Sequence, residues 1–459
     1  MQLFCCAKDK SYATMSILGR IEHTRLFKTY HALKARISPV WHGMRFALAR
    51  SRRRKLVHVT YVGVTGSCGK TTTKELIGAI LSKRDHGVTS RMTTNRLERV
   101  ASTLLSLRRR DHFCVHELGG FEPGALARTA KLFRPDIGVI TNVRYDHYSA
   151  FGSLDAIAQE KGSLIESLPE KGFAILNADD ERVIAMQDRT GAQVITYGLS
   201  NSAMVKGEDV SPSWPNGVAL TVRHDEQRVR VQTQLLGEHW AYAVLAAMAT
   251  AVAMEIPLEE AADAISNVAP VEGRLNTQQF DGVTFIDDSW KSPLYSMPVC
   301  LKVMEEADAK RKIAVIGTMA DHPGSSSRRH RKAAKQALAV ADMVIFVGRW
   351  ARSALKAGTE ETKDRLMGFE SVYQLRKYLR TFLEPGDVVL LKGCGADHLE
   401  RILIDRQKKV KCWRDGCKRI MRCTDCKLRF TTFVPVDAMA GNLTPDSEAD
   451  AVAEVEPGS

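Results

Sequence analysis

A glycine-rich stretch at residues 65–73, Thr-Gly-Ser-Cys-Gly-Lys-Thr-Thr-Thr, has the residue types needed to bind phosphate groups. Gly66 and Gly69 let the backbone curl so that its amide hydrogens converge on phosphate oxygens. Lys70 supplies a mobile cation for the terminal phosphates, and Thr71 offers a hydroxyl to Mg²⁺. The stretch therefore predicts a nucleotide-binding loop that works with a magnesium ion.

The elements around this loop support the same interpretation. A β-branched run at residues 57–64 precedes it, and a helical pattern follows, so the positive end of a helix points at the phosphates. Val64 stands where the general phosphate-loop pattern has glycine, but the shorter form Thr-Gly-x-x-Gly-Lys-Thr-Thr is complete. We include Thr72 among the nucleotide-binding residues.

Strand and helix signals alternate along most of the chain, which is typical of a mostly parallel sheet covered by helices. The expected strands of the first α/β run are Phe113–Leu118, Ile137–Thr141, Ala174–Asn177 and Val194–Tyr197. Residues 205–235 alternate and predict a small antiparallel patch, and Ala241–Ile256 predicts a buried helix. A second run after a hinge at Val268–Arg274 has strands expected at Phe285–Asp287, Ile313–Gly317, Met343–Gly348 and Val388–Lys392.

These patterns predict an α/β protein with a phosphate-loop central domain and a C-terminal Rossmann-like α/β domain. The expected division is a basic helical arm (1–55), a central ATP-binding domain (56–273), a C-terminal domain (274–405), a basic segment with four cysteines (406–435) and an acidic disordered tail (436–459). Within the arm, residues 17–50 read as an amphipathic helix that packs on the body or lies on a membrane surface.

The short loop form and several downstream motifs, in order over residues 56–405, resemble the Mur ligase family. The resemblance implies an ATP-dependent ligase that converts a carboxylate into an acyl phosphate, which an amine then displaces with release of ADP. Two anions must meet in such a reaction, so Mg²⁺ and cationic side chains have to offset the charge.

The resemblance also implies roles for individual residues. Glu117, in the motif HELGGFEPGAL, and His147 match positions at which the family holds Mg²⁺. Lys161 matches a lysine that many members carry as a metal-binding carbamate; unmodified, it would be a solvated helix residue, and both alternatives stay open. Arg274 at the hinge and Lys291 match phosphate-binding positions, and Lys291 completes the site only when the domains close.

The nucleotide-binding part of the motif set is altered in one place. His239 is kept in the segment LLGEHWAYAVLAA, but Trp240 and Ala243 replace the usual asparagines, so stacking by Trp240 becomes an alternative adenine contact. Asp288, in IDDSWKSPLYS, matches the residue that faces the ribose. Gly395 replaces the arginine of the usual Lys-Gly-Ser-Arg signature, which alters the expected recognition of the incoming amine.

The reaction type carries over better than the substrates. Only 55 residues precede the first expected core strand, too few for the globular N-terminal domain that binds the UDP-sugar in wall-building members. A UDP-MurNAc-peptide with D-Ala-D-Ala or another amine is the first expectation, and a peptide or polyglutamate-type acid is the alternative. A non-catalytic regulatory relative and a nucleic-acid-linked NTPase are the competing function classes.

Four cysteines, Cys412, Cys417, Cys423 and Cys426, cluster within the basic segment. In a large cytosolic chain such a group reads first as a metal site, here a structural tetrahedral Zn²⁺ site. A reduced segment without metal is the alternative.

The charge of the chain is unevenly distributed. Residues 1–55 carry +11 and residues 401–435 carry +8, whereas residues 436–459 carry −6, and together these segments give the net charge of +13. The basic ends are either solvated surface or contacts for an anionic surface or nucleic acid. No apolar run reaches the roughly 18 residues that span a bilayer, and the N-terminus lacks the order of a secretory signal, so we expect a cytoplasmic protein.

Overall fold

The computed structural model describes residues 41–91, 95–319, 323–408, 410–417, 419 and 421–433. Residues 41–55 are helical. Residues 41–50 belong to the amphipathic helix predicted for 17–50, and the observed helix continues to residue 55. The predictions for residues 1–40 and for the acidic tail concern parts of the chain outside these ranges.

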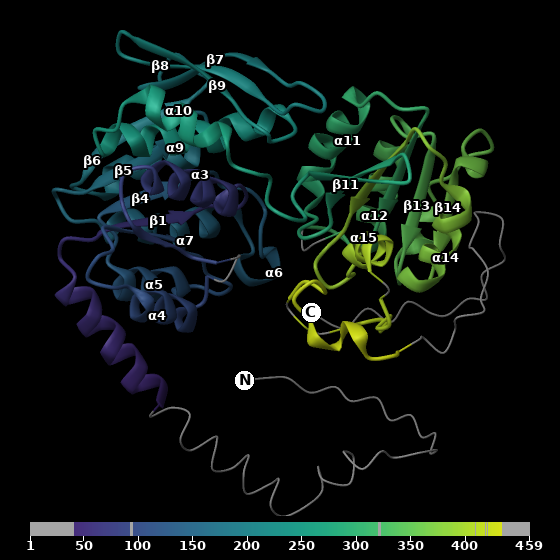
Figure 1. Ribbon diagram of the computed structural model, residues 1–459, viewed down its shortest axis with the longest axis horizontal. Coiled ribbons are helices and arrows are strands. Elements are labelled where there is room, and N and C mark those ends of the chain that lie inside the picture. Colours follow the sequence, from purple (N-terminus) through teal and green to yellow (C-terminus); the bar gives the residue numbers. More distant parts are fainter. Residues whose placement is uncertain are drawn as a thin grey trace, which may run out of the picture.

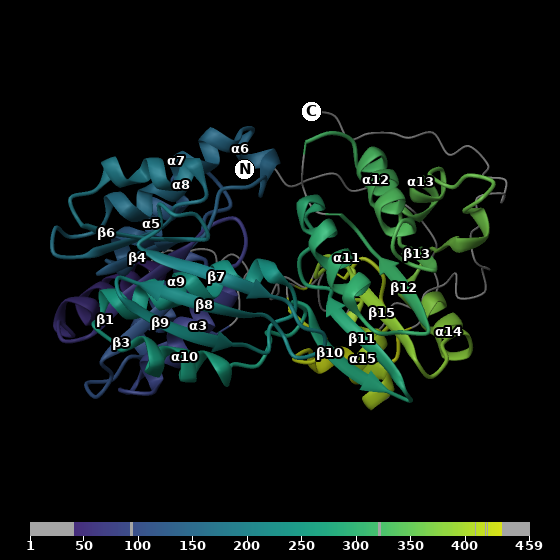
Figure 2. The same cartoon turned by 90° about the horizontal axis from the view of Figure 1, so that it is seen from above.

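The first α/β layer system is built on a nine-stranded sheet with the order β2-β3-β1-β4-β5-β6-β7-β8-β9 (Figures 1 and 2). Its strands are β1 (Thr60–Thr65), β2 (Gly87–Thr89), β3 (Phe113–Glu117), β4 (Ile137–Ile140), β5 (Phe173–Asn177), β6 (Gln193–Gly198), β7 (Val205–Ser211), β8 (Ala219–His224) and β9 (Gln227–Gln232). The first seven strands in this order, from β2 through β1 to β7, pair in parallel. Strands β7, β8 and β9 pair antiparallel, as predicted for residues 205–235.

Helices cover both faces of this sheet. They are α3 (Lys70–Ser82), α4 (Leu97–Ser106), α5 (Ala125–Phe133), α6 (Tyr148–Phe151), α7 (Leu154–Glu166), α8 (Glu181–Ile184), α9 (Ala241–Ala253) and α10 (Leu258–Ser266). Helices α3, α9 and α10 pack together on one face, and α4, α5 and α7 on the other (Figure 1). Because side chains alternate along a strand, Val62 and Val64 of β1 join the first core and Tyr61 the second.

The second system is a six-stranded sheet with the order β10-β11-β15-β12-β13-β14. Its strands are β10 (Asn276–Phe280), β11 (Val283–Asp288), β12 (Arg311–Ile316), β13 (Met343–Val347), β14 (Leu366–Phe369) and β15 (Asp387–Lys392), and its helices are α11 (Met297–Glu306), α12 (Ser326–Leu338), α13 (Ala351–Leu355), α14 (Val372–Phe382) and α15 (Glu400–Gln407). Only β10 runs antiparallel.

The mixed α/β class and the parallel-dominated sheets are confirmed, and the exact domain boundaries stay predictions. Three strands were not expected: β2, β10 and β14. Each lies at an edge of its sheet, where one side lacks a pairing partner and the strand needs less apolar surface. β2 has three residues, and β10 reads Asn-Thr-Gln-Gln-Phe, so neither shows the β-branched run by which a central strand is found.

Candidate active site

The carboxyl ends of three neighbouring parallel strands meet at one edge of the first sheet. β1 ends in the glycine-rich loop, β3 ends at Glu117, and β4 leads into residues 141–147. Because β1 lies between β3 and β4, these three segments must converge. This edge faces the second sheet, so the site lies between the two systems (Figure 2).

The glycine-rich loop has the backbone conformation that the sequence predicts. Gly66 and Gly69 have φ values of 144° and 81°, and a β-carbon on Gly66 would overlap the Thr141 hydroxyl. The ammonium of Lys70 curls back onto the loop, with Nζ 2.6 Å from the Gly66 carbonyl oxygen. Burial and the nearby charge of Lys291 lower the pKa of Lys70. An anion bound next to the Lys70 ammonium would stabilise its charged form.

Oxygen ligands suited to Mg²⁺ lie beside the loop. The Thr71 hydroxyl donates to Glu117 Oε2 at 2.7 Å, and both side chains are buried. Arg274 crosses from the hinge and donates to the same hydroxyl at 2.9 Å. His147 lines the cavity that also contains Glu117. A hydroxyl, a carboxylate and a neutral imidazole form a donor set that fits a divalent cation; burial holds the pKa of His147 below its ordinary value.

Thr72 is buried on α3, at 2% exposure, and does not line either of the two cavities described below. Its neighbour Thr73 is among the residues that line the cavity on the side of His239 and Trp240.

Lys291 reaches the first sheet from the second, as the prediction requires. Its Nζ lies 3.3 Å from the Ser67 carbonyl oxygen and 2.8 Å from Asp146 Oδ2. Asp146 was missed in the sequence, although it directly precedes His147. It is buried, and the cations Lys291 and Lys70 overcome the effect of that burial and hold its pKa well below the usual range. Asp146 therefore holds Lys291 by an ion pair and stabilises the charge of Lys70 without a direct contact.

Lys161 lies on α7 and is subject to the charges of Lys70, Asp146 and Lys291. Burial, followed by repulsion from Lys70, lowers the pKa of Lys161 to about 7. A substantial fraction of this amine is therefore neutral near pH 7, which is the form that reacts with CO₂ to give a carbamate.

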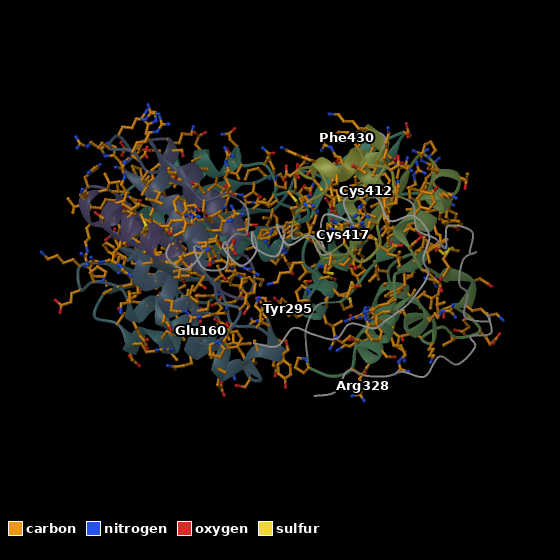
Figure 3. The ribbon with its side chains drawn as sticks, turned by 90° about the horizontal axis from the view of Figure 1, so that it is seen from below. Glu160, Tyr295, Arg328, Cys412, Cys417 and Phe430 are labelled. Carbon is orange, nitrogen blue, oxygen red and sulfur yellow. The ribbon has the colours of Figure 1, made fainter. Side chains whose placement is uncertain are left out.

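Two cavities meet at the loop. One, of about 360 Å³, lies on the side of His239, Trp240 and Asp288; the other, of about 390 Å³, lies on the side of Glu117 and His147. Both are lined by Cys68, Gly69, Arg274 and Lys291. Figure 3 labels Tyr295, which lines the first cavity, and Cys417, which lines the second.

The first cavity has the features of a nucleotide pocket. The rings of His239 and Trp240 lie 4.4 Å apart at its wall, and burial lowers the pKa of His239 to about 4, so the imidazole is neutral. Asp288 Oδ2 accepts a hydrogen bond from Lys392 at 2.6 Å and one from the Cys300 thiol at 2.9 Å. This pairing of β11 and β15 fixes the Asp288 carboxylate at the cavity wall.

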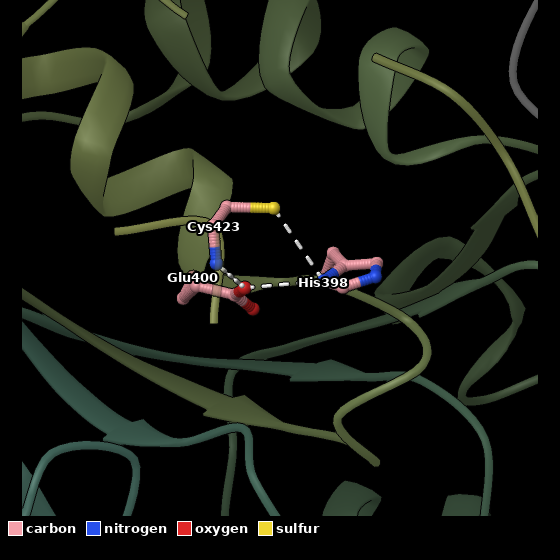
Figure 4. A group of neighbouring side chains, drawn as sticks. All are labelled: His398, Glu400 and Cys423. Carbon is pink, nitrogen blue, oxygen red and sulfur yellow. Dashed lines mark hydrogen bonds and ion pairs between the residues drawn. The ribbon is translucent and has the colours of Figure 1, made fainter. Parts of the chain in front are cut away.

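The cysteine cluster differs from the prediction. All four cysteines line one cavity of about 70 Å³ with His398. Among the described residues, however, the one group with ligand atoms close enough to share a metal is His398, Glu400 and Cys423. Their contacts are hydrogen bonds, with His398 Nδ1 3.2 Å from Glu400 Oε1 and 3.5 Å from Cys423 Sγ (Figure 4). A site of four thiolates around Zn²⁺ is therefore not supported, because His398 and Glu400 take the position next to Cys423.

Comparison with known proteins agrees with this geometry. The family model of the Mur ligase middle domain matches residues 64–251, and that of the Mur ligase glutamate ligase domain matches residues 273–395. The chain belongs to the Mur ligase family. Accordingly it is an ATP-dependent, ADP-forming ligase.

Curated members of the Mur ligase family resemble most of the chain. The UDP-N-acetylmuramoyl-tripeptide--D-alanyl-D-alanine ligase of Mycobacterium tuberculosis (strain ATCC 25618 / H37Rv) is 30% identical over 364 residues, covering 74% of this chain and 71% of that protein. The Escherichia coli (strain K12) ligase of the same name is 30% identical over 302 residues, covering 64% of this chain and 66% of that protein.

Solved structures agree on the fold. A crystal structure of MurF from Acinetobacter baumannii superposes with a TM-score of 0.73 at 25% identity, covering 79% of this chain and 80% of that one. MurF ligase from Thermotoga maritima, solved in complex with ADP, gives 0.69 at 21% identity, covering 80% and 83%.

Within the described residues, no helix of this Mur ligase is long and apolar enough to cross a membrane.

Proposed function

We propose that this Mur ligase joins the free carboxylate of a UDP-MurNAc-peptide to the amine of D-Ala-D-Ala. ATP would transfer its γ-phosphoryl group to the carboxylate oxygen with release of ADP. The amine nitrogen would then attack the acyl carbon, and phosphate would leave as the amide bond forms. The reaction would take place in the cytoplasm, where ATP is available.

The observation that carries this proposal is the meeting of two cavities at Lys291 and the glycine-rich loop. A ligase of this type needs the terminal phosphoryl group between a nucleotide site and a site for a second anion. The substrate-side cavity is lined by four cationic side chains, those of Lys70, Arg274, Lys291 and Arg419, and by one carboxylate, that of Glu117. Such a balance favours an anionic substrate.

We assign the roles of the residues on the same basis. Lys70 and the loop amides would hold the phosphates, and Thr71, Glu117 and His147 would hold Mg²⁺, which offsets the charge of the transferring group when bound. Lys291 and Arg274 would contact the terminal phosphoryl group from the second sheet and the hinge.

Three further assignments concern the edges of the site. Asp288 would face the ribose, with His239 and Trp240 against the adenine. The Lys161 carbamate, once formed, would add an anion beside the metal ligands.

The test is ADP release by the purified chain with ATP, Mg²⁺, UDP-MurNAc-tripeptide and D-Ala-D-Ala. We expect release only when both substrates are present, and loss of release in Lys70→Ala. Lys83→Ala is the matched control, since Lys83 lies at the far end of α3 in an exposed pair with Asp263. ATP binding without turnover on these substrates would refute the proposal. Screening other amino acids and polyglutamate-type acids would then separate a ligase with another substrate from a non-catalytic relative.

A further inference from the structure

Residues 410–417, 419 and 421–433, here called the C-terminal wall, lie outside both matched family models and fold back from α15 toward the junction of the two sheets (Figure 1, yellow). Trp413 anchors it: the indole is 3% exposed, packs in the core of the second sheet and donates to the Val410 carbonyl oxygen at 3.0 Å. The wall is therefore a packed part of the protein.

Arg422 fastens the wall to the hinge between the two sheets. Its guanidinium donates to Asp287 Oδ2 at 2.9 Å, next to the end of β11, and lies 3.3 Å from Glu272 of the hinge. Gly273 leaves the space that this guanidinium fills, because a β-carbon there would overlap Arg422. With the Arg422 side chain 8% exposed and Asp287 fully buried, this pair fixes the wall relative to the site.

The next part of the wall holds Arg419 in place. The Arg419 amide donates to the sulfur of Cys417, and Cys417 also contacts His398, which is itself paired with Glu400. These contacts set the backbone at Arg419 while leaving its side chain exposed.

Cys417, Arg419 and Met421 line the substrate-side cavity together with the glycine-rich loop. Gly395 lines it too, and a β-carbon at Gly395 would lie only 3.3 Å from the Trp290 ring, so this position has little room for a side chain. The loop after β15 has Gly395, and therefore no guanidinium, at this point of the cavity. The C-terminal wall supplies a guanidinium to the same cavity through Arg419.

We propose that Arg419 binds the carboxylate of the incoming amine substrate, an amino acid or dipeptide with a free carboxyl end. This inference rests on the proposed function. The incoming amine has to approach the acyl phosphate from the side opposite the nucleotide, which is the cavity that the wall closes. Lys291 contacts Asp146 and Arg274 contacts Thr71 beside the glycine-rich loop, whereas Arg419 reaches the same cavity from the C-terminal wall.

The experiment compares D-Ala-D-Ala with D-Ala-D-Ala amide, which lacks the carboxylate, in the full-length chain and in Arg419→Gln. A charge-assisted hydrogen bond at an exposed side chain predicts a rise of about tenfold in KM for D-Ala-D-Ala in Arg419→Gln. We expect an unchanged KM for ATP and for UDP-MurNAc-tripeptide, and the same KM for the amide in both proteins. Arg414→Gln is the matched control, because Arg414 is an exposed arginine of the wall that lines only the cysteine cavity.

Each other outcome has a separate meaning. An unchanged KM for D-Ala-D-Ala in an active Arg419→Gln variant overturns the inference and leaves the proposed function intact. An equal rise for the dipeptide and its amide, or a rise only for UDP-MurNAc-tripeptide, overturns the assignment to this carboxylate. A wild-type chain inactive with both dipeptides refutes the proposed function and this assignment with it.

Discussion

Asp146 is the residue whose replacement tests the charge arrangement of the site most directly. Its carboxylate lies 2.8 Å from Lys291 Nζ, is 8% exposed, and also stabilises the charge of Lys70. At an effective dielectric constant of about 20, two unit charges at this distance attract by about 6 kcal/mol. Because desolvation opposes this and Lys291 is 30% exposed, we expect Asp146→Asn to lower the free energy of unfolding by about 2–3 kcal/mol.

Asp146→Asn also distinguishes an effect on the position of Lys291, which changes kcat, from an effect on ATP binding, which changes the KM for ATP. Without the carboxylate, Lys291 loses its position, and we expect kcat to fall by about 10²-fold, the scale for loss of one preorganised electrostatic contact. The KM for ATP should not rise, since Asp146 repels the triphosphate. Steady-state ADP release and urea unfolding measure the two effects.

Asp405→Asn is the matched control for this prediction. Asp405 is also buried and accepts hydrogen bonds from Arg376 and Arg380, both at 2.6 Å, but it lies on α15 and does not line either active-site cavity. Its loss should reduce stability while kcat stays near the wild-type value. A kcat of Asp146→Asn within about threefold of wild type, a barrier change below about 1 kcal/mol, would refute the reasoning.

Two further predictions concern protonation. Since burial and Lys70 bring the pKa of Lys161 to about 7, ¹³C-bicarbonate should give a carbamate signal in NMR that grows from pH 6 to 8 and is absent in Lys161→Gln; an identical spectrum for that variant would contradict this. Burial also lowers the pKa values of His116, His239 and His330 to about 4. Because these folded pKa values lie below the unfolded value of about 6.5, their contribution to stability is complete above pH 6.5 and is lost as pH falls toward 4, so the urea midpoint should drop across that window; a flat profile would exclude this contribution.

The glycine-rich loop was predictable because its chemistry is local: its glycines, lysine and threonine are contiguous, and the strand and helix that position them flank it. Glu117 ends β3 and His147 follows β4, and because these strand ends share an edge both residues line one cavity; their role as Mg²⁺ ligands stays a prediction. The resemblance to the Mur ligase family supplied the roles that spacing alone leaves open.

Asp146 could not be identified in the same way, because its importance depends on a partner 145 residues away along the chain. The cysteine cluster shows a different limit of sequence spacing, and the zinc site predicted there is not supported. Four nearby cysteines suggest one metal site when only their spacing is considered, but Cys423 is met by His398 and Glu400, which precede it by more than 20 residues. The spacing of cysteines in the sequence shows which metal ligands one segment can offer. It does not show which residues from other parts of the fold contact those cysteines.

The charge balance of the cleft links the modification of Lys161 to catalysis. As the chain stands, Lys70, Lys161, Lys291 and Arg274 lie around two carboxylates, those of Asp146 and Glu117. Burial first, and the neighbouring positive charges second, lower the pKa values of Lys70 and Lys161. A triphosphate alone would reverse the sign of this balance, and Mg²⁺ would partly restore it. A carbamate at Lys161 removes one cation and adds one anion, which favours metal binding, whereas the ammonium form opposes it. Metal affinity should therefore rise with bicarbonate concentration in the wild-type chain and not in Lys161→Gln.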